Sequence, residues 1–264
     1  MWEPRGQRVV ITGASSGIGA ATALELARLG AIVGLVARRE AELGEVLAAC
    51  RQHSPESTMF VADLADLDGI AALVERVTAQ LGRIDVLVNN AGVPKRRRAA
   101  ALTLDDAAEV MRINYFSPVA LTITVLPAMR ERGTGHVVNI SSMGAHMVAF
   151  GVGAYSATKA ALEMFTESMY VELSGSGVHA HVVVPGTTSS EFSTPKDGND
   201  PPFPSDPSTT ASPEVVAAAI IACLSDDRFI TYATDRDAAT AAAKQADPNA
   251  FLASMRERLA GMRR

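Results

Sequence analysis

The chain has 264 residues, 48% of them apolar, which suits one large α/β domain. Its net charge of −5 lacks the excess of Lys and Arg typical of nucleic-acid binders, so we expect no nucleic-acid partner. The longest apolar run, residues 215–224, is about half of the ~20 residues that a membrane span needs. The N-terminus lacks the apolar stretch of a signal peptide, so we expect a cytoplasmic protein without a membrane span.

Short β-branched runs alternate with longer helix-like stretches over the first two thirds of the chain. We expect strands at residues 8–11, 31–36, 59–61, 86–88, 136–140 and 178–184, and helices at 17–29, 40–51, 69–81, 104–132 and 155–173. Such alternation indicates βαβ units, a mainly parallel sheet and helices on both of its faces. We predict a single-domain α/β fold over residues 1–264, a doubly wound, Rossmann-like sheet with a ligand crevice at its carboxyl edge.

The last third of the chain is less regular. Six of the 13 prolines fall between Pro195 and Pro213, which is incompatible with a regular element. We expect residues 187–213 to form a loop that covers the substrate, with a solvated linker as the alternative. A helix at 213–224, a short strand at 229–232 and a helical tail at 236–264 follow. The tail includes an amphipathic stretch at 249–259, for which core or oligomer packing is favoured over membrane contact.

The two cysteines, Cys50 and Cys223, lie in apolar, helix-like stretches. Such thiols are usually buried, so we expect neither a disulfide nor a metal site from them. No metal ion is expected in the functional site.

The first expected strand runs into a glycine-rich turn that opens a helix. Glycines let a backbone approach a pyrophosphate closely, and a helix N-terminus offers free N–H groups and a positive dipole end. The spacing is G-x-x-x-G-x-G, and its position at the first βα junction is what makes it informative. The expected cofactor-binding residues in this turn are Gly13, Ser15, Ser16, Gly17, Ile18 and Gly19.

The second expected strand ends without the carboxylate that would accept the ribose hydroxyls of NAD. Ala37 stands there, followed by Arg38 and Arg39. Arginine can hold a 2′-phosphate through a forked, charge-assisted contact. Two solvated charges at the start of a helix are the alternative. The pattern favours NADP(H) as the cofactor, with NAD(H) as the second option.

Four polar residues further along form a candidate catalytic set. Tyr155 and Lys159 are four residues apart on an expected helix, so both project from one face. A nearby ammonium favours the phenolate and is expected to lower the pKa of the tyrosine, which could then act as acid and base. Ser142 follows the strand at 136–140, where its hydroxyl can polarise a substrate oxygen. Asn114 is an amide in mid-helix, a poor helix former that invites an explanation, although surface polarity would suffice.

The ordered set of these motifs resembles the short-chain dehydrogenase/reductase family, in its form of about 250 residues with a Y-x-x-x-K active site. Each motif is weak, but together they are specific and cover residues 8 to about 190. The matching pieces are residues 12–19, Asp63-Leu64, Asn89-Asn90-Ala91-Gly92, Asn114, Ser142, Tyr155 with Lys159, and Pro185-Gly186.

The resemblance implies a role for each matching residue. Tyr155 would be the acid/base, Lys159 would lower its pKa and hold the nicotinamide ribose, and Ser142 would orient the substrate oxygen. Asn114 would anchor a water that relays protons from Lys159. The resemblance places the remaining cofactor contacts at Asp63, Leu64, Asn90, Ala91, Gly92, Pro185, Gly186 and Thr188.

Two positions depart from the family pattern. Ser190 stands where the family often has a threonine that holds the carboxamide, which makes the anchoring of the nicotinamide less certain. Ser16 stands where many NADP-preferring members carry a basic residue, so Arg38 and Arg39 alone would select the phosphate.

In this family the segment between Ser142 and Tyr155 lines the substrate pocket. Here it is apolar and rich in adaptable methionine, with Met143, His146, Met147 and Phe150 as candidate substrate residues. We therefore expect a lipophilic carbonyl or alcohol, such as a steroid, a retinoid-like compound or an acyl derivative. Ordinary core packing of these side chains is the alternative.

The basic run Lys95-Arg96-Arg97-Arg98 follows the Asn-Ala-Gly turn. A solvated loop is the default interpretation of such a run, and a site for an anionic carrier is the sharper one.

Two rival functions remain at this stage: a cofactor-binding regulatory protein without turnover, and an epimerase or dehydratase on the same scaffold. The intact set of Asn114, Ser142, Tyr155 and Lys159 argues against the first. The resemblance also implies a homodimer or homotetramer acting on a small-molecule substrate.

Overall fold

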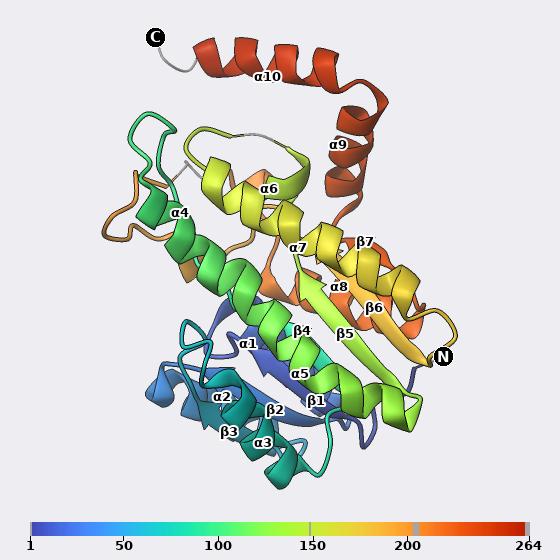
Figure 1. Cartoon of the computed structure of the whole chain (residues 1–264). Coiled ribbons are helices and arrows are strands. Elements are labelled where there is room, and N and C mark those ends of the chain that lie inside the picture. The colour runs from blue at the N-terminus through green and yellow to red at the C-terminus, as the bar shows by residue number, and fades with distance from the viewer. Residues whose placement is uncertain (1, 148, 203–205, 262–264) are drawn as a thin grey trace.

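The computed structural model describes residues 2–147, 149–202 and 206–261. Seven strands form a parallel sheet in the order β3-β2-β1-β4-β5-β6-β7 (Figure 1). Their bounds are β1 (Arg8–Thr12), β2 (Ile32–Ala37), β3 (Thr58–Val61), β4 (Val86–Asn89), β5 (Gly135–Ile140), β6 (Val178–Val184) and β7 (Ile230–Tyr232). The order reverses between β1 and β4, which opens a crevice at the carboxyl ends of these two strands. The predicted doubly wound, Rossmann-like fold is confirmed.

Helices cover both faces of the sheet. On one face pack α1 (Gly17–Arg28), α2 (Glu40–Arg51) and α8 (Pro213–Ser225), and on the other α3 (Ile70–Leu81), α5 (Ser117–Arg132) and α7 (Gly153–Glu172). Strand β1 is buried on both sides: Val9 and Ile11 join the first core, and Val10 between them joins the second. This follows from the two-residue period of a strand.

The predicted long helix at 104–132 is interrupted. It consists of α4 (Leu104–Met111), a π-helical turn (Arg112–Phe116) and α5 (Ser117–Arg132). Thr103 begins α4 with a capping box. Its hydroxyl accepts from the backbone N–H of Asp106, and the Asp106 carboxylate accepts from the backbone N–H of Thr103. The sequence pattern did not reveal the π turn, because each flanking helix keeps its own apolar spacing and only the phase between them shifts.

Three further helices follow the sheet or lie beyond it. The short α6 (Met143–His146) comes directly after β5, and α9 (Asp235–Ala246) packs against α6. Helix α10 (Pro248–Gly261) packs chiefly on α9 and lies apart from the sheet (Figure 1). Phe251 and Met255 of α10 are partly buried and Leu252 is exposed, so these residues lie outside the core of the single chain, and the expected oligomer packing stays a prediction.

Two further expectations concern the bulk of the chain. Cys50 and Cys223 are free and buried, as predicted. None of the helices in the described ranges combines the length and the apolar character needed to cross a membrane.

Candidate active site

The turn after β1 is bonded directly to the turn after β4. Thr12 Oγ1 accepts from the backbone N–H groups of Asn90 and Ala91, each at 3.0 Å, and Asn90 Nδ2 donates to Thr12 O at 2.9 Å. Gly13 has a φ of +66°, and a Cβ there would lie 2.9 Å from Ala91 Cα. A Cβ on Gly19 would collide with Gly13 O. Only glycine fits at these two positions, so the floor of the crevice is bare backbone.

The rim of this turn carries the two arginines that follow β2. Arg39 donates to Ser15 Oγ at 3.2 Å and to Ser16 Oγ at 2.7 Å, and it pairs with Glu191 at 2.8 Å. Arg38 is largely exposed, with Asp63 as an ion-pair partner at 3.9 Å. Both guanidinium groups therefore lie at the β2 end of the crevice, where the predicted 2′-phosphate contact would be made.

The candidate catalytic serine and tyrosine meet above the end of β5. Ser142 begins α6, and its Oγ accepts from the N–H of Gly144 at 3.0 Å. A Cβ on Gly144 would lie 3.2 Å from the ring of Tyr155 and 3.3 Å from Ser142 Oγ. Ser142 also shares a side-chain hydrogen bond with Tyr155.

Lys159 and Asn114 meet on the other side of the same space. A Cβ on Gly92 would lie 3.3 Å from Asn114 Oδ1 and 3.6 Å from Lys159 Nζ. Lys159 is 4% exposed, and its Nζ donates to Ile140 O at 2.8 Å. The structure thus brings the four predicted catalytic residues together at the carboxyl edge of β4 and β5.

Asn114 explains the π turn. The turn places its fully buried amide against the β4 loop, where Oδ1 accepts from Val93 N at 2.8 Å and Nδ2 donates to Val93 O at 3.0 Å. Nδ2 also lies 3.2 Å from Thr158 Oγ1. Single π turns inside helices are frequent at functional sites, and here the turn clamps the β4 loop to α7. The alternative of surface polarity for Asn114 is wrong.

The electrostatics of the pair on α7 differ from the expectation. Burial raises the pKa of Tyr155 to about 12, with the Ser142 hydrogen bond acting in the opposite direction. Burial lowers the pKa of Lys159 to about 8, against the opposing charge of Glu163. In the chain alone the pKa of Tyr155 is therefore raised rather than lowered as predicted, because desolvation dominates.

Glu163, one helical turn beyond Lys159, was missed by sequence reasoning. This buried carboxylate accepts from Ser141 Oγ and contacts His146 Nε2 at 3.0 Å, and the His146 ring packs edge-on against Tyr232 at 5.5 Å. Glu163 therefore fastens α6 and the end of β5, which carry Ser142, to the helix that carries Tyr155. The signal was available, since Glu163 is four residues from Lys159 and so lies on the same helix face.

The segment after β6 approaches the crevice from the remaining side. Pro185 O accepts from Met143 N at 2.8 Å, and Thr188 Oγ1 donates to Gly186 O at 3.2 Å. A Cβ on Gly186 would collide with the carboxylate of Asp237 in α9. Across the turn, Ser190 Cβ would lie 3.2 Å from a Cβ on Gly17.

At the far end of the crevice, the two residues predicted to flank the adenine follow β3. Asp63 is half exposed, and its Oδ1 accepts from Ala65 N at 3.0 Å. Leu64 is buried in the second core. Between these ends, the turn residues Ile18 and Ala91 are partly buried and pack against the first and second cores, respectively.

The expected covering loop lies against the candidate catalytic tyrosine. The rings of Phe192 and Tyr155 are 5.5 Å apart. The described part of the loop contains two short 3₁₀ turns, Glu191–Ser193 and Pro207–Thr209, and a bridge between Thr188 and Ala211. Residues 203–205 of this loop, and residues 262–264 of the expected tail, lie outside the described residues.

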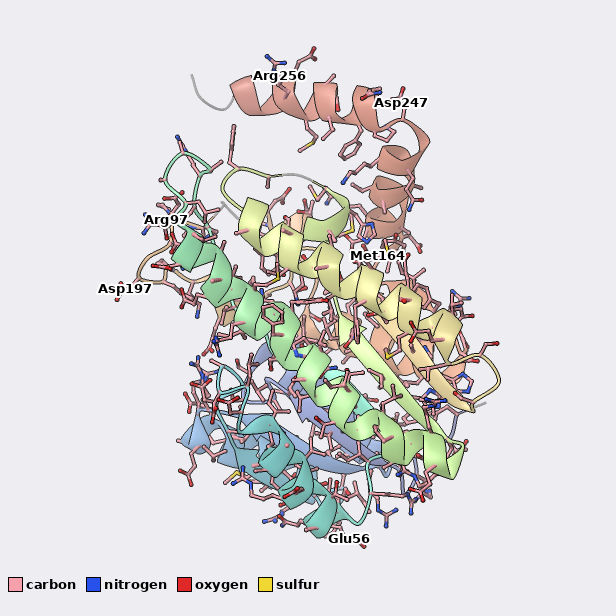
Figure 2. The ribbon with its side chains drawn as sticks, viewed as in Figure 1. Glu56, Arg97, Met164, Asp197, Asp247 and Arg256 are labelled. Atoms are coloured by element: carbon pink, nitrogen blue, oxygen red, sulfur yellow. The ribbon has the colours of Figure 1, made fainter. Side chains whose placement is uncertain are left out.

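The basic run after Gly92 is not a solvated loop. Arg96 is 6% exposed and donates to the carbonyl oxygens of Thr194 and Asp200 at 3.0 and 3.1 Å, and Arg97 donates to Gly198 O at 3.1 Å. Arg97 and Asp197 mark these two loops in Figure 2.

The first residue of the run is buried as well. Lys95 pairs with Asp106 at 2.7 Å and with Glu109 at 3.2 Å. The default interpretation, a solvated loop, is therefore wrong for Lys95 and Arg96. A site for an anionic carrier could not use these two side chains either, because both bind partners within the chain. Arg98 alone is exposed.

Of the four candidate substrate residues, three are tied into the structure around α6, and one, Phe150, lies beyond it. Met143 is buried in a third core cluster with Val182, Val184 and Ala241, so the packing alternative holds for this residue. Met147 packs at the edge of that cluster, and His146 is held by Glu163. Phe150 is partly exposed, close to the loop segment at Gly151 that accepts from Arg97 N at 2.6 Å.

Comparison with known proteins agrees with this geometry. A family model described as short chain dehydrogenase matches residues 7–200. An uncharacterized oxidoreductase of Mycobacterium tuberculosis is 41% identical over 174 residues, which are 64% of this chain and 51% of that protein. A fatty acyl-CoA reductase of Acinetobacter baylyi is 40% identical over 172 residues, 64% of this chain and 58% of that protein. Each match spans only about half of these relatives.

Solved structures extend the likeness over nearly the whole chain. A short-chain dehydrogenase from Streptomyces avermitilis has a TM-score of 0.81 at 30% identity, covering 97% of this chain and 98% of that one. Another, from Sphingobium yanoikuyae in complex with NADPH, has a TM-score of 0.79 at 29% identity, covering 97% and 95%. The chain therefore belongs to the short-chain dehydrogenase/reductase family.

Proposed function

We propose that this protein is an enzyme that interconverts a carbonyl compound and an alcohol with NADP(H), and that Tyr155 is its acid/base. The observation that carries the proposal is that Ser142 and Tyr155 meet at Gly144, and Lys159 and Asn114 at Gly92, all at the carboxyl edge of β4 and β5. Gly92 follows the β4 turn that is bonded to the glycine turn, so a nucleotide bound there would bring its reactive end toward Tyr155.

The residues present fit a dinucleotide. Gly13 and Gly19 leave a cradle that any Cβ would fill, and the N-terminus of α1 faces it. We propose that the residues at 13–19, together with Asp63, Leu64 and residues 90–92, hold the adenosine half and pyrophosphate, and that Lys159, Pro185, Gly186 and Thr188 hold the nicotinamide half. When bound, the nicotinamide supplies or accepts the hydride.

The chain's own residues handle the proton. Because burial raises its pKa to about 12, Tyr155 is neutral at pH 7 and can donate its proton to a carbonyl oxygen. Ser142 Oγ, oriented by Gly144 N, would hydrogen-bond the same oxygen. This protonation state favours carbonyl reduction. Lys159, buried beside Asn114, would hold the ribose and return a proton to Tyr155 through a water anchored by Asn114.

The arginines after β2 support NADP(H) as the preferred cofactor. Arg38 is exposed and Arg39 is anchored on Ser15 and Ser16, so both guanidinium groups border the place of a 2′-phosphate. The relative with bound NADPH is consistent with this, and a structure from Burkholderia phymatum in complex with NAD, at 24% identity and a TM-score of 0.84, shares the fold. NAD(H) stays the second option.

We further propose that the substrate is lipophilic and that residues 187–213 cover it. Phe192, packed on Tyr155, supports both points. A fatty acyl-CoA reductase among the relatives makes acyl compounds worth testing with steroid-like and retinoid-like ones. Cytoplasmic location, action of residues 1–264 as one domain, and a homodimer or homotetramer stay predictions.

The test follows the near-ultraviolet absorbance of NADPH, and separately of NADH, with lipophilic ketones, aldehydes, quinones and acyl ketones. We expect Tyr155→Phe to lower kcat by about 10²–10⁴. Tyr170→Phe, which alters an exposed tyrosine of the same helix, should keep full activity.

Arg38→Glu should shift the cofactor preference from NADPH toward NADH. Turnover without net use of the cofactor would indicate an epimerase or dehydratase, and tight binding without any turnover a regulatory protein.

A further inference from the structure

Three of the chain's five histidines gather at the amino ends of β5 and β6, far from the candidate active site. His136 and His179 are paired in register, and His181 lies opposite Val138 on the same sheet face. The rings of His136 and His181 are nearly parallel, with centroids 5.3 Å apart, and His136 Nδ1 lies 3.0 Å from His181 Nε2. This histidine cluster consists of His136, His179 and His181.

The tautomer of His181 follows from its second contact. Its Nδ1 lies 2.8 Å from Arg228 O, and a carbonyl oxygen only accepts, so Nδ1 carries the proton. The lone pair of Nε2 then points toward His136. An imidazole whose far nitrogen is fixed on a backbone carbonyl is the usual arrangement of a histidine that binds a metal ion.

A carboxylate completes the set. Asp227, in the connection between α8 and β7, has a φ of +51° and is the single non-glycine residue with a positive φ in the described ranges. One ligand atom from each of His136, His181 and Asp227 lies within 4.8 Å of the other two. His179 Nδ1 lies 2.8 Å from Asp227 Oδ1, so it can hold this carboxylate in place.

We propose that His136, His181 and Asp227 form a binding site for a divalent cation of the zinc class. Two imidazole nitrogens and one carboxylate oxygen are a ligand set of open zinc sites, whereas Mg²⁺ and Ca²⁺ prefer oxygen alone. Ligand atoms about 2.1 Å from one tetrahedral ion lie ~3.4 Å apart. Reaching that spacing takes only small side-chain rotations, since the Asp227 side chain is more than half exposed.

The surroundings favour a neutral, metal-binding form of the rings. His181 is 1% exposed, and burial lowers its pKa; burial also lowers the pKa of His136 to about 4. Burial therefore disfavours the protonated form of both rings.

The site would be structural rather than catalytic. Ser142 is six positions after His136, just beyond the end of β5, and a rise of ~3.3 Å for each position places the two sites about 20 Å apart. A bound ion would join β5, β6 and the α8–β7 connection at the amino edge of the sheet. The proposal is independent of the proposed oxidoreductase reaction.

The chain carries its own reporter for this test. Trp2 is the only tryptophan, and its ring centroid is 6.4 Å from that of His136. Untagged, chelator-treated protein is titrated with Ni²⁺, whose partly filled d shell quenches nearby fluorescence, and Zn²⁺ is added in competition. We expect saturable quenching at one equivalent, reversed by Zn²⁺, and a rise of Tm with Zn²⁺.

Two variants and one control decide the outcome. Asp227→Asn, at an exposed loop position, and His181→Gln should each weaken Zn²⁺ binding at least tenfold. His53→Asn, an exposed histidine outside the cluster, should bind like the wild type. Absence of saturable quenching in the wild type, or equal Zn²⁺ affinity in the Asp227 and His53 variants, would overturn the proposal. NADPH-dependent turnover is measured in parallel and should not change.

Discussion

At the scale of single residues, Lys159 combines a charge with nearly complete burial. Its Nζ donates to Ile140 O, and burial lowers its pKa from 10.5 to about 8. Below pH 8 the folded and unfolded chains both carry the proton, so the folded state bears the full cost of burying the charge. The cost falls as pH rises from 8 toward 10.5, because only the unfolded chain is then protonated.

We therefore expect cofactor-free Lys159→Met to be more stable than the wild type by about 2 kcal/mol at pH 7, and to lose most of this advantage at pH 10. Urea unfolding at the two pH values measures it. Lys95→Met is the control: this buried lysine pairs with Asp106 and Glu109, so its loss should destabilise the chain at both pH values. An advantage of Lys159→Met that does not change with pH would contradict the argument.

At this scale, the sequence allowed a shared site to be predicted where the spacing of residues along one helix or strand determines which side chains lie close together. The four-residue spacing of Tyr155 and Lys159 and the strand-end position of Ser142 were enough to predict a shared site. The direction of the tyrosine pKa was not predictable, because it depends on burial produced by Phe192 and neighbouring segments. The histidine cluster had a visible signal, since His179 and His181 alternate in one strand, but its partners His136 and Asp227 come from separate elements.

At the scale of elements, two loops hold each other above the crevice. Arg96, from the loop after β4, donates to carbonyl oxygens of Phe192, Thr194 and Asp200 in the covering loop. Backbone bonds add to these contacts: Arg96 N donates to Asn199 Oδ1, and Asp200 N donates to Arg96 O, both at 2.6 Å. Because the guanidinium is buried, these hydrogen bonds are protected from competition by water.

We expect Arg96→Met to release the covering loop. Trypsin should then cut after Lys196 at least about tenfold faster than in the wild type, since losing charge-assisted hydrogen bonds costs roughly 1.5–3 kcal/mol. Mass spectrometry of the fragments over time measures the rate. The control is Arg98→Met, whose side chain is exposed. Equal cleavage of the Arg96 and Arg98 variants would show that the loop is held without the guanidinium.

Most strands and helices could be predicted from periodicity, because buried parallel strands and amphipathic helices leave regular patterns. The role of the basic run could not, since its partners at 192–200 lie about a hundred residues away. Lys95 through Arg98 look like any solvated charge run until Asp106 and the loop carbonyls are brought beside them. The π turn at Asn114 was hidden for a related reason: its cause, the Val93 backbone, belongs to another segment.

At the scale of the whole molecule, the two ends of the sheet strands hold separate sites, and helix α10 lies apart from the sheet. The carboxyl edge holds the candidate catalytic residues, and the amino edge holds the histidine cluster. The chain order β1-β2-β3, then a crossover to β4, determines that the crevice opens at the carboxyl edge, and this was predictable from the alternation of elements. The placement of α10 was not predictable, because its apolar side could equally have joined the core.

Helix α10 packs chiefly on α9 and adds no buried side chain to the core clusters among the described residues. We expect removal of residues 247–264 to change the free energy of unfolding of the single chain by no more than about 1 kcal/mol, because little apolar area is re-exposed. Urea unfolding at several protein concentrations measures it. Removing residues 235–264 is the comparison: it also takes Ala241 from the cluster with Met143 and should cost several times more. A concentration-dependent loss of stability on removing α10 alone would contradict this expectation and indicate that the exposed face of α10, with Leu252, packs on a second copy of the chain.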